Sequence, residues 1–184
     1  MVDEIADDGS DDERMHPEIQ RGEVMLLAGQ AEAAFAAFQG RLAVWSGSVA
    51  GHLGAAAALL RLDRPLEALA HYDAVLTVQP GHWVACYGRG AILQRASRLV
   101  DALAAYDQAL VSTPDPVSVQ IARGDLLLNL SDPRAALSAF EAALAADANS
   151  VRALTGRGAA LVHCRVAEID RTAEPWAPMG YDCR

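Results

Sequence analysis

The chain has 184 residues and a formal net charge of −9 at pH 7, and 52% of its residues are hydrophobic. This apolar content suffices for a sizeable core, and the acidic balance argues against a nucleic-acid-binding surface, which would be basic. Three cysteines without a C-x-x-C pair predict neither a disulfide framework nor a zinc site. The sequence has no apolar run of about eighteen residues and no apolar N-terminal segment, so we expect no membrane span and no secretory signal, with the cytoplasm as the default location.

Residues 1–14 form a strongly acidic segment. Such a segment cannot bury enough apolar surface to order itself, so we expect a disordered, solvated tail. A second interpretation is that it folds onto a basic groove of the same chain. Its acidic residues are Asp3, Glu4, Asp7, Asp8, Asp11, Asp12 and Glu13, against the single basic Arg14.

Residues 15–150 carry a pattern that returns every 34 residues. Each unit contains six such positions: a small residue, a leucine or methionine, an alanine, an aromatic ring, a further residue of the second stretch, and a residue of the linker. In the clearest unit these are Gly90, Leu93, Ala102, Tyr106, Ala109 and Pro114. The same spacing gives Ala56, Leu59, Ala68, Tyr72, Val75 and Pro80 before it, and Gly124, Leu127, Ala136, Phe140, Ala143 and Ala148 after it. The first unit is weaker, with Gly22, Met25, Ala34, Phe38, Arg41 and Ser46.

Each unit contains two stretches with helical apolar periodicity, separated by turn residues. The alanine and the ring of the second stretch are four residues apart, so they share one helix face. The ring can then fill the space beside a close crossing of the two helices. We expect helices at 16–28, 31–44, 49–61, 65–78, 83–95, 99–112, 117–129, 133–146 and 151–163, and no strands.

The repeats are expected at 15–48, 49–82, 83–116 and 117–150, with a half repeat at 151–164. The last unit begins in phase with Gly158 and Leu161. Glu174 then replaces the ring, and two prolines, at 175 and 178, bar a full second helix. We therefore interpret 165–184 as a degenerate C-terminal cap or tail, with a short helix near 166–173.

This pattern resembles the tetratricopeptide repeat (TPR) family over residues 15–164. The resemblance implies an all-α, right-handed α-solenoid of antiparallel helix pairs, with about four and a half TPR units. It also implies a scaffold for protein–protein interaction. The tryptophan of the family's first helix is absent: that position holds Glu18, His52, Cys86, Gln120 and Leu154.

No catalytic motif accompanies the repeats. The chain has neither a G-x-S-x-G nor a phosphate-binding G-x-x-x-x-G-K sequence, and its five histidines lack metal-ligand spacing. We therefore expect no enzymatic activity, no cofactor and no metal. The family's carboxylate-gripping lysine and asparagine are also missing, which disfavours a chaperone-tail clamp.

An arginine occupies one phase in four of five first helices, at 21, 89, 123 and 157. One interpretation is structural: the stem lies on apolar surface and the guanidinium pairs with a carboxylate of a neighbouring repeat. The other is a basic ladder that faces a ligand. The position borders the internal stripe, which favours the structural interpretation.

The resemblance places one stripe of each first helix on the inner curve of the solenoid, where we expect a groove for a peptide or helix of a partner protein. An alternative is that its apolar members pack against the next repeat. The chain would then be an adaptor; alternatives are the substrate-docking arm of a larger, glycosyltransferase-like enzyme and a single-client assembly chaperone. The expected partner is a protein or peptide, not nucleic acid or membrane. The candidate groove residues are Ile19, Glu23, Leu53, Arg61, Tyr87, Arg95, Ile121, Asp125 and Asn129.

Overall fold

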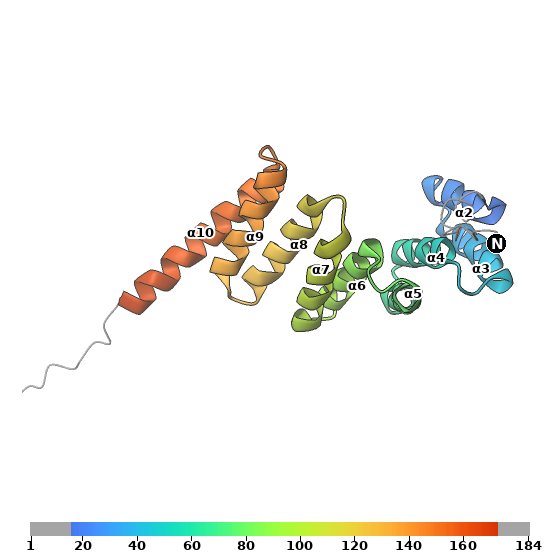
Figure 1. Ribbon diagram of the computed structural model, residues 1–184, viewed down its shortest axis with the longest axis horizontal. Coiled ribbons are helices and arrows are strands. Elements are labelled where there is room, and N and C mark those ends of the chain that lie inside the picture. The colour runs from blue at the N-terminus through green and yellow to red at the C-terminus, as the bar shows by residue number, and fades with distance from the viewer. Residues whose placement is uncertain (1–15, 173–184) are drawn as a thin grey trace, which may run out of the picture. The chain divides into compact units, whose positions relative to one another are not determined.

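The computed structural model describes residues 16–172, with side chains described through residue 166. The expected acidic tail at 1–14 and the segment 173–184 lie outside the described residues. The described part forms nine α-helices and no strand (Figure 1). It divides after Pro114 into two compact units, and each is considered by itself.

The first unit contains three helix pairs. The helices are α2 (Pro17–Leu27), α3 (Ala31–Val44), α4 (Val49–Arg61), α5 (Pro65–Val78), α6 (Trp83–Arg95) and α7 (Leu99–Ser112). Each helix packs against the next along the chain, and α2 also contacts α4. The second unit contains α8 (Pro116–Asn129), α9 (Pro133–Ala146) and α10 (Val151–Thr172), and α10 contacts both others. The eight helices before α10 lie within one residue of the predicted bounds.

The turns inside the repeats share one backbone conformation. The residue between the two helices of a pair has a positive φ, which reverses the chain in few residues. These residues are spaced by 34: Gly29 at 75°, Asp63 at 55°, Ser97 at 60° and Ser131 at 58°. Prolines at the first position of α5 and α9 then begin the second helix of the pair, because their fixed φ is helical and their missing N–H would have had no partner there.

The predicted break after residue 163 is wrong, because α10 continues without a turn to Thr172. The next place in the series of positive-φ residues is Arg165, which is helical. A left-handed backbone costs about 1–2 kcal/mol for a residue with a Cβ, and the arginine side chain offers no short hydrogen bond to offset it. The last unit is therefore one long helix that crosses the expected boundary at 164, rather than a helix followed by a short one.

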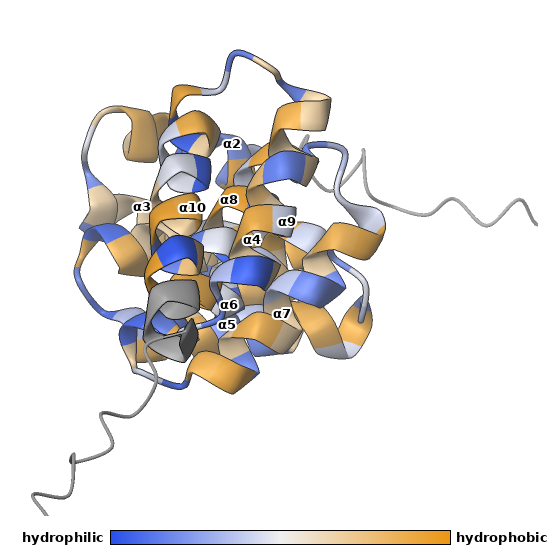
Figure 2. Ribbon diagram, turned by 90° about the vertical axis from the view of Figure 1, so that its left-hand side faces the viewer, coloured by the Kyte–Doolittle hydropathy of each residue, from blue (hydrophilic) through white to orange (hydrophobic). Residues whose placement is uncertain are grey.

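The core of each unit is built around the aromatic rings of the second helices. Phe38 and Phe140 are fully buried, and Tyr72 and Tyr106 nearly so. The hydropathy colouring shows that every helix has both hydrophobic and hydrophilic residues, as this one-sided burial requires (Figure 2). Small residues of the first helices make room for the rings, so packing rather than polar contact determines where the helices cross.

The Phe38 and Phe140 rings each lie between two first helices, that of their own repeat and that of the following repeat. A Cβ atom added to Gly22 would lie 2.5 Å from the Phe38 ring, and one added to Gly54 would lie 2.3 Å from it. Phe140 has the same relation to Gly124, at 2.7 Å, and to Gly156, at 2.3 Å. Real Cβ atoms do not approach other atoms this closely. Each of these two rings thus holds its own repeat against the next one.

Ala102 tests this packing, because it is buried in α7 while Ala104 on the same helix is exposed. We expect Ala102→Leu to lower the free energy of unfolding by about 1–3 kcal/mol, because three extra carbon atoms do not fit a close helix crossing. Ala104→Leu, the matched control, should change it by less than about 0.5 kcal/mol. Chemical denaturation measures both; equal effects would show that the helix phase is wrong.

Candidate partner-binding surface

Two of the nine predicted groove residues are in the core. Ile19 is 1% exposed and packs with Phe38 and with alanines of α3 and α4. Ile121 is 4% exposed in α8. Their expected place on an open groove is therefore wrong. For Ile19 the alternative of packing against the next repeat is correct, because alanines of α4 cover it. An apolar side chain in a repeat can be covered by the next repeat, which the residue type alone does not reveal.

Leu53 and Tyr87 are half-buried at corresponding places on α4 and α6. Leu53 packs against the core cluster around Tyr72. The Tyr87 ring lies 5.7 Å from the Tyr106 ring, and the Tyr106 hydroxyl donates a hydrogen bond of 2.9 Å to Oε1 of Gln94. Each of the two side chains therefore has one packed side and one side open to solvent.

Arg61 and Arg95 lie eight residues after Leu53 and Tyr87, at the ends of α4 and α6. Nη1 of Arg61 donates to the backbone carbonyl of Leu26, and Nη2 of Arg95 lies 3.3 Å from Oδ1 of Asp63. Each guanidinium therefore also ties its repeat to the preceding one. Because each printed contact uses one of five N–H donors, donors remain for another group.

The other predicted surface residues are polar. Glu23 is exposed on α2, and Asn129 is exposed at the end of α8. In the second unit Asp125 lies 3.3 Å from Nη2 of Arg152 on α10. Burial raises the pKa of the Asp125 carboxyl, and the adjacent Arg152 partly opposes that rise. These residues add no apolar anchor to the surface.

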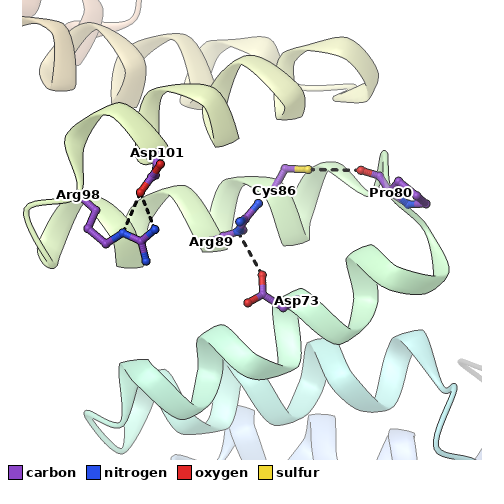
Figure 3. Close-up of polar contacts among 6 residues, drawn as sticks. All are labelled: Asp73, Pro80, Cys86, Arg89, Arg98 and Asp101. Atoms are coloured by element: carbon purple, nitrogen blue, oxygen red, sulfur yellow. Dashed lines mark hydrogen bonds and ion pairs between the residues drawn. The ribbon is translucent and has the colours of Figure 1, made fainter.

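The arginine at position 89 has the structural role proposed from the sequence. Its Nε lies 3.1 Å from Oδ1 of Asp73 on α5, so the guanidinium joins two consecutive repeats (Figure 3). Nearby, Arg98 pairs with Asp101 at the start of α7, and the thiol of Cys86 points to the carbonyl of Pro80 (Figure 3). Burial raises the pKa of the Cys86 thiol, and the adjacent Arg89 partly opposes that rise.

A shallow hollow of about 300 Å³ lies between α2 and α3. None of the nine predicted residues lines it. The corresponding place in the second repeat is filled. His71 stands there, 34 residues after Ala37, and the Phe35 ring lies edge-on to the His71 ring with 6.2 Å between the ring centroids. The hollow therefore lies on the side of the first repeat that corresponds to the side of the second repeat on which the first one packs. Its lining residues are Glu18, Arg21, Met25, Ala33, Ala36, Ala37 and Gly40.

Two histidines of the second repeat form a pair that sequence reasoning did not predict. Nδ1 of His52 lies 2.9 Å from Nδ1 of His71, and Nε2 of His52 lies 3.0 Å from the carbonyl oxygen of Ser46. The carbonyl oxygen can only accept a hydrogen bond, so Nε2–H of neutral His52 donates to it. Nδ1 of His52 is then an acceptor, and Nδ1–H of His71 donates to it. Among the described residues, no group of three or more His, Cys, Asp or Glu side chains could hold a metal ion. Within the same residues no helix is long and apolar enough to cross a bilayer.

The repeats decide the family. A model of the tetratricopeptide repeat family matches residues 53–116 and 121–163, more than half of the chain. The chain belongs to the tetratricopeptide repeat family. TPR folds are generally modules for protein–protein interaction and generally non-catalytic. No curated protein matches the chain at a significant level.

Solved TPR structures share the fold at low sequence identity. MamA has a TM-score of 0.75 at 15% identity, covering 83% of each chain. PilF of Pseudomonas aeruginosa has a TM-score of 0.75 at 22% identity, covering 89% of this chain and 74% of its own. YrrB, described as a TPR protein with an unusual peptide-binding site, has a TM-score of 0.70 at 19% identity, covering 84% and 79%. At these identities the likeness concerns the fold.

The histidine pair predicts a dependence of stability on pH. Burial lowers the pKa of His71, and the adjacent His52 adds to this, while Glu67 opposes it. The folded pKa is below the unfolded value of about 6.5, so this contribution to stability is present above that pH and is lost as the pH falls below it. We expect the unfolding free energy to decrease between about pH 7.5 and pH 5.5, and to decrease less in His71→Gln. The control is His163→Gln, an exposed residue of α10; identical pH profiles for all three chains would contradict the prediction.

Proposed function

We propose that this TPR protein is a non-catalytic adaptor whose first unit binds a peptide or helix of a partner protein. The binding surface consists of Leu53 and Arg61 on α4 and Tyr87 and Arg95 on α6, with Glu23 of α2 at its edge. The observation that carries the proposal is the coincidence of two half-buried apolar side chains and two exposed guanidinium groups at the same phase of consecutive repeats.

The apolar pair would provide the anchors. A side chain that is packed on one side is already ordered, so binding to its open side costs less conformational entropy than binding to a free side chain. Tyrosine and arginine are also the residues that most often dominate interface energies. Tyr87, supported by the Tyr106 ring, therefore has the properties of a central anchor.

The arginine pair would select an acidic partner segment. The Arg95 side chain is 64% exposed although one nitrogen contacts Asp63. A carboxylate of the partner can accept from the remaining donors of the fork, and such charge-assisted bonds are stronger than neutral ones. The partner chemistry is then an apolar residue followed by acidic residues. YrrB's description as a peptide-binding TPR protein is consistent with this class of ligand.

A peptide selected from a random library on the immobilised full chain provides the probe. We expect Tyr87→Ala and Arg95→Gln each to weaken its Kd by about tenfold or more, which corresponds to about 1.4 kcal/mol. Arg98→Gln removes the same charge three residues away on α7 and should leave the Kd unchanged. Isothermal titration calorimetry measures the affinities, and circular dichroism checks that the variants fold.

Selected peptides that bind both variants as tightly as the natural chain would contradict this surface. A variant that begins at Met15 tests whether the acidic residues 1–14 bind to this surface. If residues 1–14 compete for the surface, their removal strengthens peptide binding; unchanged affinity discards them as a self-ligand.

A further inference from the structure

The two facing histidines of the second repeat are not required by the packing of the repeats. The place of His71 on the second helix is taken by an alanine in every other repeat, at Ala37, Ala105 and Ala139. The place of His52 on the first helix is taken by Glu18, Cys86, Gln120 and Leu154. Because the other helix pairs form without these rings, the two imidazoles are an addition to the second repeat and not a part of the repeated core.

The two rings meet through nitrogen atoms of the kind that metal ions bind. The Nδ1 atoms of His52 and His71 are 2.9 Å apart, the ring centroids are 5.1 Å apart and the ring planes differ by 50°. With metal–nitrogen bonds of about 2.0–2.1 Å, two neighbouring ligands of a square-planar or octahedral ion are about 2.9 Å apart, and two ligands of a tetrahedral ion about 3.3–3.4 Å. The nitrogen atoms therefore already have the spacing of ligands that share one ion. Each ring needs only to turn about χ2, which is a soft torsion in histidine.

His52 also has the second hydrogen bond that is typical of a metal-binding histidine. Its Nε2 lies 3.0 Å from the backbone carbonyl oxygen of Ser46, in the linker before α4. In metal sites the ring nitrogen that does not bind the ion almost always donates to a carbonyl or a carboxylate, which fixes the tautomer and the ring orientation. Here that bond leaves the lone pair of Nδ1 of His52 facing His71. On the other ring, Phe35 packs edge-on against His71.

We propose that His52 and His71 together bind one divalent transition-metal ion through their Nδ1 atoms. Imidazole nitrogen suits Ni²⁺, Cu²⁺ and Zn²⁺, whereas Mg²⁺ and Ca²⁺ prefer oxygen ligands. The site has two protein ligands, and water molecules complete the coordination; within the described residues no group of three or more His, Cys, Asp or Glu side chains could hold an ion. The nearby Glu67 is not a ligand, since both of its oxygen atoms accept hydrogen bonds of 2.6 Å from Arg64. Metal binding here does not require the partner-binding surface proposed above.

Binding of the ion changes the tautomer of His71. Without the ion, Nδ1–H of His71 donates to Nδ1 of His52. When the ion binds, this proton leaves Nδ1 and the solvent supplies one to Nε2, so the imidazole stays neutral and no net proton is released. Two metal–nitrogen bonds then replace one hydrogen bond between the rings. The ion joins α4 to α5 and stabilises the folded chain, because the unfolded chain does not hold the two rings together.

Titration of the full chain with NiCl₂ at about pH 7.5, where most histidines are neutral, tests the proposal by calorimetry. We expect His52→Gln and His71→Gln each to weaken the Kd for Ni²⁺ by about tenfold or more, because either change leaves a single imidazole. The double variant should bind no more weakly than the single variants, since the two rings act as one site. The matched control is His163→Gln, which removes an exposed imidazole of α10 and should leave the Kd unchanged. Circular dichroism checks that the variants fold.

An unchanged Kd in His52→Gln or in His71→Gln overturns the proposal, and so does an equal loss in His163→Gln, which would show that Ni²⁺ binds to surface histidines in general. A second measurement needs no substitution. Imidazole nitrogen NMR of the natural chain, saturated with ZnCl₂, should show His71 change from the Nδ1–H to the Nε2–H tautomer while His163 keeps its signals. An ion bound at any other group leaves the proton on Nδ1 of His71, and that result also overturns the site.

Discussion

The structure depends on one repeated contact, in which an aromatic ring of a second helix is held between two first helices. The Phe38 ring occupies the space that a Cβ atom would need at Gly22 in its own repeat and at Gly54 in the next repeat. Phe140 does the same with Gly124 and Gly156. Because one ring serves two helices, a repeat cannot complete its core alone. The period of 34 residues follows from this requirement, since the ring and both small residues must return together.

Polar contacts reinforce the junctions that the rings create. Arg89 reaches Asp73, Arg95 reaches Asp63, and Arg61 reaches the carbonyl of Leu26, each across one junction between repeats. These side chains are exposed, so each contributes little to stability by itself. The contacts of Arg61 and Arg95 instead fix the positions of these guanidinium groups relative to the half-buried Leu53 and Tyr87. The surface that we propose for partner binding thus includes residues that also connect consecutive repeats.

The eight helices before α10 could be predicted to within one residue, because the residues of the turns between them are unambiguous. Gly29 and the Ser131-Asp132-Pro133 segment break a helix by their own backbone properties. The burial of Ile19 could not, since alanines of the next repeat supply the contacting atoms. The pairing of His52 with His71 could not either, since it depends on how α4 and α5 pack inside one repeat. Gly54, Gly88 and Gly156 share one phase of the sequence, and that signal could have revealed the second wall of the ring site. The missing turn at Arg165 could also have been predicted, because an arginine stands there in place of the glycine, aspartate or serine of the earlier turns.

The most direct test of the ring contact compares two glycines on one helix. Gly156 faces the Phe140 ring, whereas Gly158 has open space around the place of a Cβ atom. If the ring determines the packing, Gly156→Ala lowers the free energy of unfolding by about 1–3 kcal/mol through overpacking. Gly158→Ala instead raises it by up to about 1 kcal/mol, because alanine is the better helix former. Urea denaturation of the two full-length variants measures the difference, and equal shifts, or a shift of the same sign at both sites, would contradict the account.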